Sequence, residues 1–317
     1  MPLTNDTETL TPRVSFAGPS LEFDFPELHI GIAEYDEGPT GCTIFHFPST
    51  VRLAVDVRGG SPGFVGDRDV TDALCFAGGS LYGLEAAMGV QSELFVMRAY
   101  STRWDSIALV SGAIIMDFGM RDNAVYPDKA LGRAALKAAK PGVFPLGPRG
   151  AGRSASVGKL ESLWERESAG QGAAFRQVGA TKIAVFSVVN AIGAIIDRHG
   201  AVVRGCLDRA ASTRHTYVEG VERKLAAAPV AAPLSGNTTL TALVTNQKLS
   251  TWSLRQIGRQ VHSSMARAIQ PFHGSFDGDV LFAVTTNDIE NELLDELSLG
   301  VLASELAWDA VLSSFSM

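Results

Sequence analysis

The chain has 317 residues, of which 46% are hydrophobic and 19% are charged, and its formal net charge is −7. This composition is typical of a well-buried globular protein, and a chain of this length can form one layered core, which we favour over two halves. The acidity and the lack of clustered Lys and Arg argue against nucleic acid as a partner, because phosphate binding needs such clusters.

Residues 1–20 combine Thr, Asp, Glu and Pro with few large apolar groups, which predicts a flexible N-terminal tail before a single domain over 21–317. The chain begins without the basic and apolar regions of a secretory signal, and its longest apolar stretch, 183–196, is interrupted by polar residues. Its three cysteines are widely spaced among apolar neighbours, which fits free thiols in a reducing compartment. We therefore expect a cytoplasmic protein that does not bind membranes.

Apolar runs and amphipathic stretches alternate along the rest of the chain. Runs bounded by Gly, Pro or Asp predict strands at 43–47, 51–57, 107–118, 183–189, 201–205 and 239–246. Apolar residues at helical spacing predict helices at 84–95, 128–139, 254–268 and 287–315, the last beginning at Asn287 with Glu290 three residues on and breaking near Gly300. Because these elements lack regular β-α-β spacing, we expect an α+β fold, such as an αββα sandwich, rather than a doubly wound sheet.

The pair Asn237-Thr238 lies between two segments of opposite character. The uncharged, Pro-containing stretch 226–236 indicates a surface connector, whereas 239–246 alternates side chains as a strand does. If the peptide bond between the pair breaks, Thr238 gains a free α-amine with a pKa of about 7.7–8.0, which can activate its own hydroxyl as a nucleophile. The same residues also fit an ordinary turn that opens a strand.

Asp277-Gly278-Asp279 stands directly before an apolar run that begins at Val280. Two carboxylates this close raise one another's pKa and can hold a hydroxyl or an ammonium between them. Asp-Gly is equally suited to a tight turn. No cluster with metal-ligand spacing accompanies the pair, so we expect neither a metal nor another cofactor.

Two further polar residues stand in unusual surroundings. Lys159 ends the small-residue loop 152–158, which could bring an ammonium to the nucleophile but lacks the spacing of a P-loop; a solvated surface lysine is the alternative. Asn190 is isolated in the apolar run 183–193, where its amide could stabilise an oxyanion or simply cap a turn. We interpret the Gly-rich segment 77–85 as close packing of a helix on a sheet rather than a dinucleotide loop, and the six histidines form no Ser-His-Asp or zinc spacing.

These segments together resemble the self-cleaving amidohydrolases that include the DmpA-type aminopeptidases and, more closely, the nylon-oligomer (6-aminohexanoate-oligomer) hydrolases. The resemblance covers nearly everything after the tail, and the residues that carry it are Glu37-Gly38-Pro39-Thr40-Gly41, Ala77-Gly78-Gly79, the run 124–136, Ser154-Ala155-Ser156, Gly236-Asn237-Thr238-Thr239, Gln260-Val261-His262-Ser263-Ser264-Met265 and Ile269-Gln270-Pro271-Phe272-His273.

The resemblance implies an αββα four-layer sandwich of the N-terminal-nucleophile type and cleavage between Asn237 and Thr238. The fragments 1–237 and 238–317 would stay associated, and the processed pairs would form a homotetramer. Thr238 would be the nucleophile in acyl transfer, and the other matching catalytic positions are Lys159, Asn190, Asp277 and Asp279.

Met116 departs from the family pattern. Relatives tend to place a Tyr just before the aspartate of the segment Asp117-Phe118, whereas this chain has Met116 there. A phenol hydrogen bond would then be missing, so the rate of processing or the substrate preference could differ.

Three alternatives to an oligomer hydrolase remain open from the sequence. The same nucleophile could serve an aminopeptidase of short α- or β-peptides, or an acetyltransferase of the ornithine type. In a different class, the chain could be an uncleaved binding or scaffold protein in which Asn237-Thr238 is only a turn.

Overall fold

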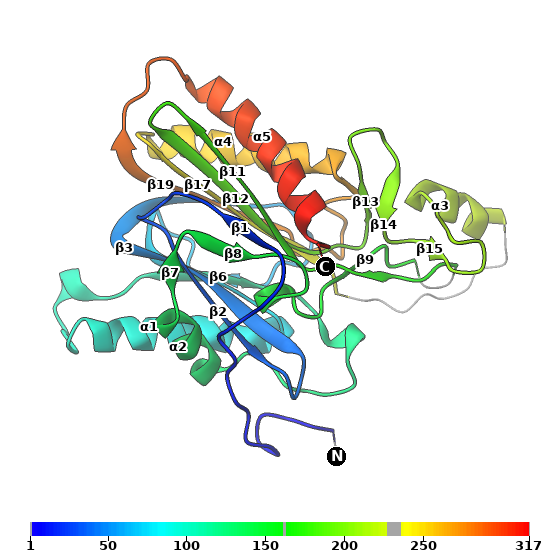
Figure 1. The fold of residues 1–317 in the computed structure, drawn as a ribbon, viewed down its shortest axis with the longest axis horizontal. Coiled ribbons are helices and arrows are strands. Elements are labelled where there is room, and N and C mark those ends of the chain that lie inside the picture. The colour runs from blue at the N-terminus through cyan, green and yellow to red at the C-terminus, as the bar shows by residue number, and fades with distance from the viewer. Residues whose placement is uncertain (1, 161–162, 227–235, 317) are drawn as a thin grey trace.

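A computed structural model describes residues 2–160, 163–226 and 236–316. Two β layers lie face to face between two layers of helices, α4 and α5 on one side and α1 and α2 on the other (Figure 1). This αββα arrangement confirms the fold class expected from the sequence.

The two β layers are parts of one bent sheet that shares the long strand β3 (Thr40–Val57). Pairing of β3 with β5 is interrupted between His46 and Val51, where Pro48 has no N–H to donate, so the strand bends there and serves both layers. The two runs predicted at 43–47 and 51–57 are therefore one strand. The sheet has the order β11-β12-β17-β19-β3-β5-β6-β4, with β2 and β7 beside β3, and its other strands are β2 (His29–Tyr35), β4 (Phe64–Val65), β5 (Val70–Ala77), β6 (Val110–Ile114), β7 (Lys140–Pro141), β11 (Gln171–Val178), β12 (Thr181–Asn190), β17 (Thr238–Gln247) and β19 (Val280–Ile289).

The helices cover the outer faces of the sheets and begin at side-chain caps that the sequence supplies. Asp128, Ser250 and Asp295 each accept a hydrogen bond from a backbone N–H three residues on, at the starts of α2, α4 and α5. The bounds are α1 (Glu85–Met97), α2 (Lys129–Lys137), α3 (Tyr217–Ala226), α4 (Thr251–Ser264) and α5 (Glu296–Ser313), with short 3-10 turns at Ser80–Leu84, Trp104–Ser106, Phe118–Met120, Gly150–Gly152 and Met265–Arg267.

Two elements predicted from the sequence have different bounds in the structure. The helix over 287–315 was wrong at its start, because β19 continues through Asn287 and the helix begins only after the Asp295 cap. It also passes through Gly300 unbroken, since that glycine lets α5 approach the Gln260 side chain of α4 closely. The strand expected at 107–118 is limited to β6, after which the chain turns into a 3-10 segment.

The space between the two sheets is filled by aromatic and aliphatic side chains. Phe45 packs with Phe76, Phe144 and Phe186 at ring-centroid distances of 5.2, 6.3 and 5.1 Å. Aromatic pairs at these separations add to the free energy of burial. The centre of the sandwich is therefore tightly packed with apolar side chains.

A smaller region extends from the end of the sandwich and carries α3 (Figure 1). Its short strands are β9 (Ser156–Val157), β10 (Glu167–Ser168), β13 (Ala194–Ile196), β14 (Val202–Arg204), β15 (Leu207–Asp208), β16 (Thr213–Arg214) and β18 (Ile269–Gln270). Two other short strands, β1 (Ser20–Glu22) and β8 (Val143–Pro145), pair with each other along the sandwich. Most of the connector predicted at 226–236, namely 227–235, lies outside the described residues.

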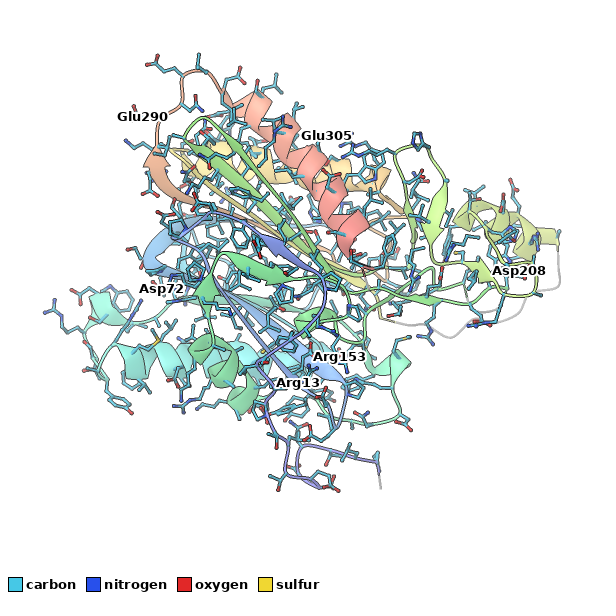
Figure 2. The ribbon with its side chains drawn as sticks, viewed as in Figure 1. Arg13, Asp72, Arg153, Asp208, Glu290 and Glu305 are labelled. Atoms are coloured by element: carbon cyan, nitrogen blue, oxygen red, sulfur yellow. The ribbon has the colours of Figure 1, made fainter. Side chains whose placement is uncertain are left out.

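The N-terminal segment runs along the body of the protein. Arg13 exchanges backbone hydrogen bonds with Glu34, and both Arg13 and Arg153 form ion pairs with the buried Glu34 carboxylate. Figure 2 shows the Arg13 and Arg153 side chains next to each other at this point. These contacts attach part of segment 1–20 to β2, whereas its flexibility remains a prediction. Among the described residues, no helix combines the length and the apolar character needed to cross a bilayer.

Candidate active site

Thr238 is the first residue of β17 and is 3% exposed. Side chains alternate across a strand, so Thr238 shares the inter-sheet face with Leu240 and Ala242. Its neighbour across the strand pair is Asn190, the last residue of β12. A Cβ at Gly278 would lie 2.7 Å from Thr238 Oγ1, so the hydroxyl fits only because residue 278 is glycine.

The carbonyl group of Asn237 is held by two donors in the buried end of the sheet. Gly278 N donates to Asn237 O at 2.8 Å, and Thr238 Oγ1 donates to the same oxygen. Asn237 also forms an isolated parallel bridge with Asp277. The peptide bond before Thr238 is therefore polarised by a backbone N–H, with a hydroxyl directly beside its carbonyl.

Lys159 and Asn190 form a buried pair next to this peptide bond. Lys159 is 8% exposed, and its Nζ donates to Asn190 O at 2.9 Å, to Asn190 Oδ1 at 3.0 Å and to Gly236 O at 3.5 Å. Asn190 Oδ1 also accepts from Ser156 N at 3.1 Å, while its Nδ2 donates to Met116 O at 3.0 Å. Lys159 is thus not a solvated surface lysine, because Asn190 binds its ammonium within the sheet end.

The carboxylates of Asp277 and Asp279 accept hydrogen bonds from different donors. Asp279 Oδ1 accepts from Thr239 N at 2.6 Å, and its Oδ2 accepts from the backbone N and Nδ1 of His273. Asp277 accepts from Gly274 N at 2.8 Å and from Ile192 N at 3.4 Å. Burial, followed by repulsion from the Asp279 carboxylate, raises the pKa of Asp277 to about 6, although the two backbone donors and Lys159 oppose the shift. Asp277 can therefore gain and lose a proton near neutral pH.

The Gly-rich segment 77–85 packs against Asp117, the residue after Met116, whose carbonyl accepts a hydrogen bond from Asn190. Asp117 accepts from Gly79 N at 2.9 Å and from Thr40 Oγ1 at 2.7 Å, and it forms a buried ion pair with Arg121. A Cβ at Gly78 would lie 2.3 Å from Asp117 Oδ2, so the segment packs closely against this carboxylate, whereas packing of a helix on a sheet was expected.

Substitution of Gly236 by alanine should slow any reaction at the Asn237–Thr238 bond. A Cβ at position 236 would lie 2.6 Å from both Cβ and Cγ of Met116, so the segment before Thr238 must shift. Overpacking costs about 1–3 kcal/mol, which corresponds to about ten-fold or more in rate if the strain falls on the reacting geometry. The measurement is the rate of chain cleavage on a denaturing gel. Combining Gly236→Ala with Met116→Gly should restore the rate, and a persistently slow double variant would show that Met116 is not the obstacle.

Sequence reasoning missed several groups that complete this arrangement. Gly278 N, Ser156 N and Met116 O are backbone atoms, and no residue type indicates that a backbone atom is used. No motif in the sequence assigns a role to the His273 side chain. Its signal was the short spacing to Asp279. Within the ranges that the structure describes, no group of three or more His, Cys, Asp or Glu side chains could hold a metal ion.

Comparison with known proteins identifies relatives over almost the whole chain. A 6-aminohexanoate-oligomer endohydrolase from Paenarthrobacter ureafaciens is 47% identical over 321 residues, which cover 98% of this chain and 90% of the relative. A protein of Agromyces sp. (strain KY5R) with the same description has the same identity and coverage. An uncharacterised aminopeptidase of Mycobacterium tuberculosis is 33% identical over 266 residues, covering 78% of this chain and 74% of its own.

Solved structures show the same fold at lower identity. A β-aminopeptidase from Burkholderia sp. matches with a TM-score of 0.66 and 14% identity, covering 96% of this chain and 89% of that chain. The L-aminopeptidase D-Ala-esterase/amidase from Ochrobactrum anthropi, described as a variant of the N-terminal-nucleophile hydrolase fold, matches with a TM-score of 0.65 and 15% identity, covering 95% and 88%. The layered sheets of the present chain therefore define an N-terminal-nucleophile-type hydrolase fold. Residues 23–315 match peptidase family S58, and the chain belongs to that family of amide-bond hydrolases.

Proposed function

We propose that this protein cleaves its own chain between Asn237 and Thr238 and then hydrolyses amide bonds with Thr238 as nucleophile. The observation that carries the proposal is the Asn237 carbonyl oxygen, which accepts hydrogen bonds from both Gly278 N and Thr238 Oγ1. A hydroxyl beside a polarised carbonyl is the starting geometry for acyl transfer.

Self-cleavage begins when Thr238 Oγ attacks the Asn237 carbonyl carbon and its proton passes to the Thr238 nitrogen. The C–N bond then breaks, leaving an ester between Asn237 and the Thr238 side chain and a free α-amine on Thr238. Water hydrolyses this ester, giving a carboxylate on Asn237 and restoring the hydroxyl. The products are fragments 1–237 and 238–317, the second with 80 residues.

In the processed enzyme, the Thr238 amine accepts the hydroxyl proton as Oγ attacks a substrate amide. The Asp277 carboxylate is a second proton acceptor, and Lys159 favours the charged form of that carboxylate. Gly278 N and the Asn190 amide are the donors for the oxyanion. Because Thr238 is 3% exposed in the uncut chain, the residues before it must leave their place before a substrate can enter.

The substrates that we propose are 6-aminohexanoate oligomers. The basis is the 47% identity, over nearly the full chain, to relatives described as 6-aminohexanoate-oligomer endohydrolases. To test this substrate assignment, the processed protein is incubated with the linear trimer and tetramer, each with a free and with a blocked amine. Chromatography then separates the products. Release of shorter oligomers from both forms supports endo cleavage.

Removal of N-terminal residues from short peptides is the second candidate function. It is favoured by the 33% identical relative described as an aminopeptidase. A requirement for a free substrate amine, together with turnover of aminoacyl amides but not of amine-blocked oligomers, would select this candidate. Both functions use the same nucleophile.

We also propose that the two fragments remain associated, that processed pairs form a homotetramer, and that the protein is cytoplasmic. Support for association comes from β17, which begins the small fragment and pairs with β12 of the large fragment, while β19 of the small fragment pairs with β3. Separating strands from the middle of a sheet exposes many backbone groups and is costly. Light scattering after size-exclusion chromatography measures the assembly, and cell fractionation measures the location.

The pH dependence of turnover follows from Asp277. Its raised pKa of about 6 means that the carboxylate, the form that accepts a proton, is lost as pH falls through about 6. We expect kcat/KM to decline below an apparent pKa of about 6, and we expect Asp277→Asn to lower the rate and remove this decline. A decline centred near 4 in the wild type would contradict the assignment. The raised pKa of Asp277 has the opposite effect on stability. Because the folded state binds this proton more tightly than the unfolded state, the free energy of unfolding increases as pH falls from 6 towards 4.

A further inference from the structure

His273 is joined to the proposed catalytic residues through Asp279. Its backbone N and its Nδ1 both lie within hydrogen-bond distance of Asp279 Oδ2, at 3.1 and 3.0 Å. The other oxygen of the same carboxylate accepts Thr239 N at 2.6 Å, one residue from the nucleophile. Asp279 is fully buried, so these donors replace the hydrogen bonds that water would otherwise give to the carboxylate.

The backbone at His273 is held in an unusual conformation. Its φ angle is 62°, in the left-handed region that few non-glycine residues adopt. This conformation directs the backbone N–H and the ring towards the same oxygen. Such local strain persists where the surrounding structure over-determines it.

A buried histidine, His262, packs against His273. The rings of His262, on α4, and His273 are 4.4 Å apart and nearly perpendicular. His262 Nδ1 is 2.8 Å from Asp56 Oδ2, and its side chain is 1% exposed. Burial lowers the pKa of His262, with the partial opposition of Asp56. His262 is therefore neutral at neutral pH and places no positive charge beside His273.

The hydrogen-bond pattern fixes the tautomers of the two rings. Each Nδ1 faces a carboxylate and so carries the hydrogen, whereas each Nε2 is buried and has no partner among the described residues. The Nδ1–H of His273 is thus directed at Asp279. The other titratable or charged groups around this chain of contacts are Asp56, Arg58, Arg259, His262, Asp277 and Lys159.

We propose that His273 is a positioning residue for catalysis. It holds the Asp279 carboxylate through Nδ1, and that carboxylate holds the start of strand β17 at Thr239, next to the nucleophile. The proposal rests on the proposed function of Thr238. Both hydrogen bonds of His273 described above reach Asp279, so its effect on Thr238 passes through that carboxylate. Its effect is therefore expected on kcat and on processing, and not on KM.

Two substitutions at position 273 distinguish the effect of the side chain from the effect of the backbone conformation. His273→Gly removes the ring but tolerates the positive φ angle. His273→Asn also tolerates that angle and places an amide N–H close to the position of Nδ1. We expect His273→Gly to slow both chain cleavage and kcat by about ten- to a hundred-fold, the usual effect of losing a hydrogen bond to a charged group. His273→Asn should restore most of the rate.

The pH profile distinguishes positioning from a general loss of stability. The pKa of Asp277 depends on repulsion from the Asp279 carboxylate, and loss of the His273 donor lets that carboxylate move, so the acid limb of kcat/KM should shift in His273→Gly. The matched control is Ile257→Ala, which creates a cavity in the apolar core under α4 and removes no hydrogen-bonding group, so it should lower the melting temperature without moving the limb.

The results for the Thr238 and His273 variants distinguish a failure of the role of His273 from a failure of the proposed function. If Thr238→Ala is still cut, the proposed function fails. If Thr238→Ala stays whole while His273→Gly is processed and turns over at the wild-type rate, only the role of His273 is overturned. A slow His273→Gly variant with an unshifted pH profile and no rescue by Asn also overturns it, because the residue would then be only structural.

Discussion

The Thr238→Ala protein should remain a single 317-residue chain and should show no amide hydrolysis above background. The hydroxyl beside the Asn237 carbonyl is the group that attacks the amide carbon in the proposed reaction, and removing a hydrolase nucleophile costs on the order of 10⁶ in turnover. Intact mass spectrometry of the purified protein, followed by an assay with 6-aminohexanoate oligomers, measures both effects.

Two further substitutions at Thr238 distinguish the loss of the hydroxyl group from a change in side-chain packing. Thr238→Val keeps the β-branched shape that fits against Gly278 but lacks the hydroxyl, so it should fold normally and remain uncut. Thr238→Ser keeps the hydroxyl and should be processed. Cleavage of the Ala or Val protein into fragments ending at Asn237 would exclude Thr238 as the internal nucleophile, and turnover by an uncut wild-type chain would show that no free amine is needed.

The Asn190→Ala protein should fold but should process itself and turn over about 10²–10³ times more slowly. Loss of one oxyanion donor has this effect in hydrolases. The substitution also removes Oδ1, which accepts from Lys159 Nζ and Ser156 N, so the free energy of unfolding should fall by about 1–3 kcal/mol. Single-turnover kinetics and denaturant unfolding measure the two quantities separately.

Asn246 provides a matched control in the same pair of strands. Its side chain is also buried and spans β17 and the start of β12, accepting from Lys182 N at 2.8 Å and donating to Ala180 O at 3.1 Å. Asn246→Ala should therefore lose similar stability at the far end of the strands while its turnover per folded molecule stays unchanged. Equal rates for the Asn190 and Asn246 variants would remove Asn190 from the catalytic machinery.

Local patterns in the sequence correctly predicted most elements around the site. The alternation at 239–246 and the apolar run at 183–189 correspond to β17 and β12, because the period of side chains in a strand reflects burial on its two faces. The helical spacing at 254–268 corresponds to α4 in the same way. The start of α5 was misplaced, since Asn287 and Asp295 are both suitable caps and only the pairing of β19 excludes the first.

The position of the site residues depends on contacts between distant segments. Lys159, Asn190 and Thr238 meet because β12 and β17 pair in a register that sets Asn190 opposite Thr238. The resemblance to a family could name these residues, but spacing alone could not, since 31 residues separate Lys159 from Asn190. The burial of Lys159, which excludes a surface role, follows only from that packing.

The sequence by itself determined the α+β class, the strand that Thr238 opens and the membership in a family of amide hydrolases. The tertiary structure alone decided that Gly278 N polarises the Asn237 carbonyl, that Met116 crowds Gly236, and that His273 holds Asp279. These contacts join backbone atoms and loops that are far apart in the chain. A residue type records its own chemistry and its local burial, whereas the partner that it meets is set by strand register and packing.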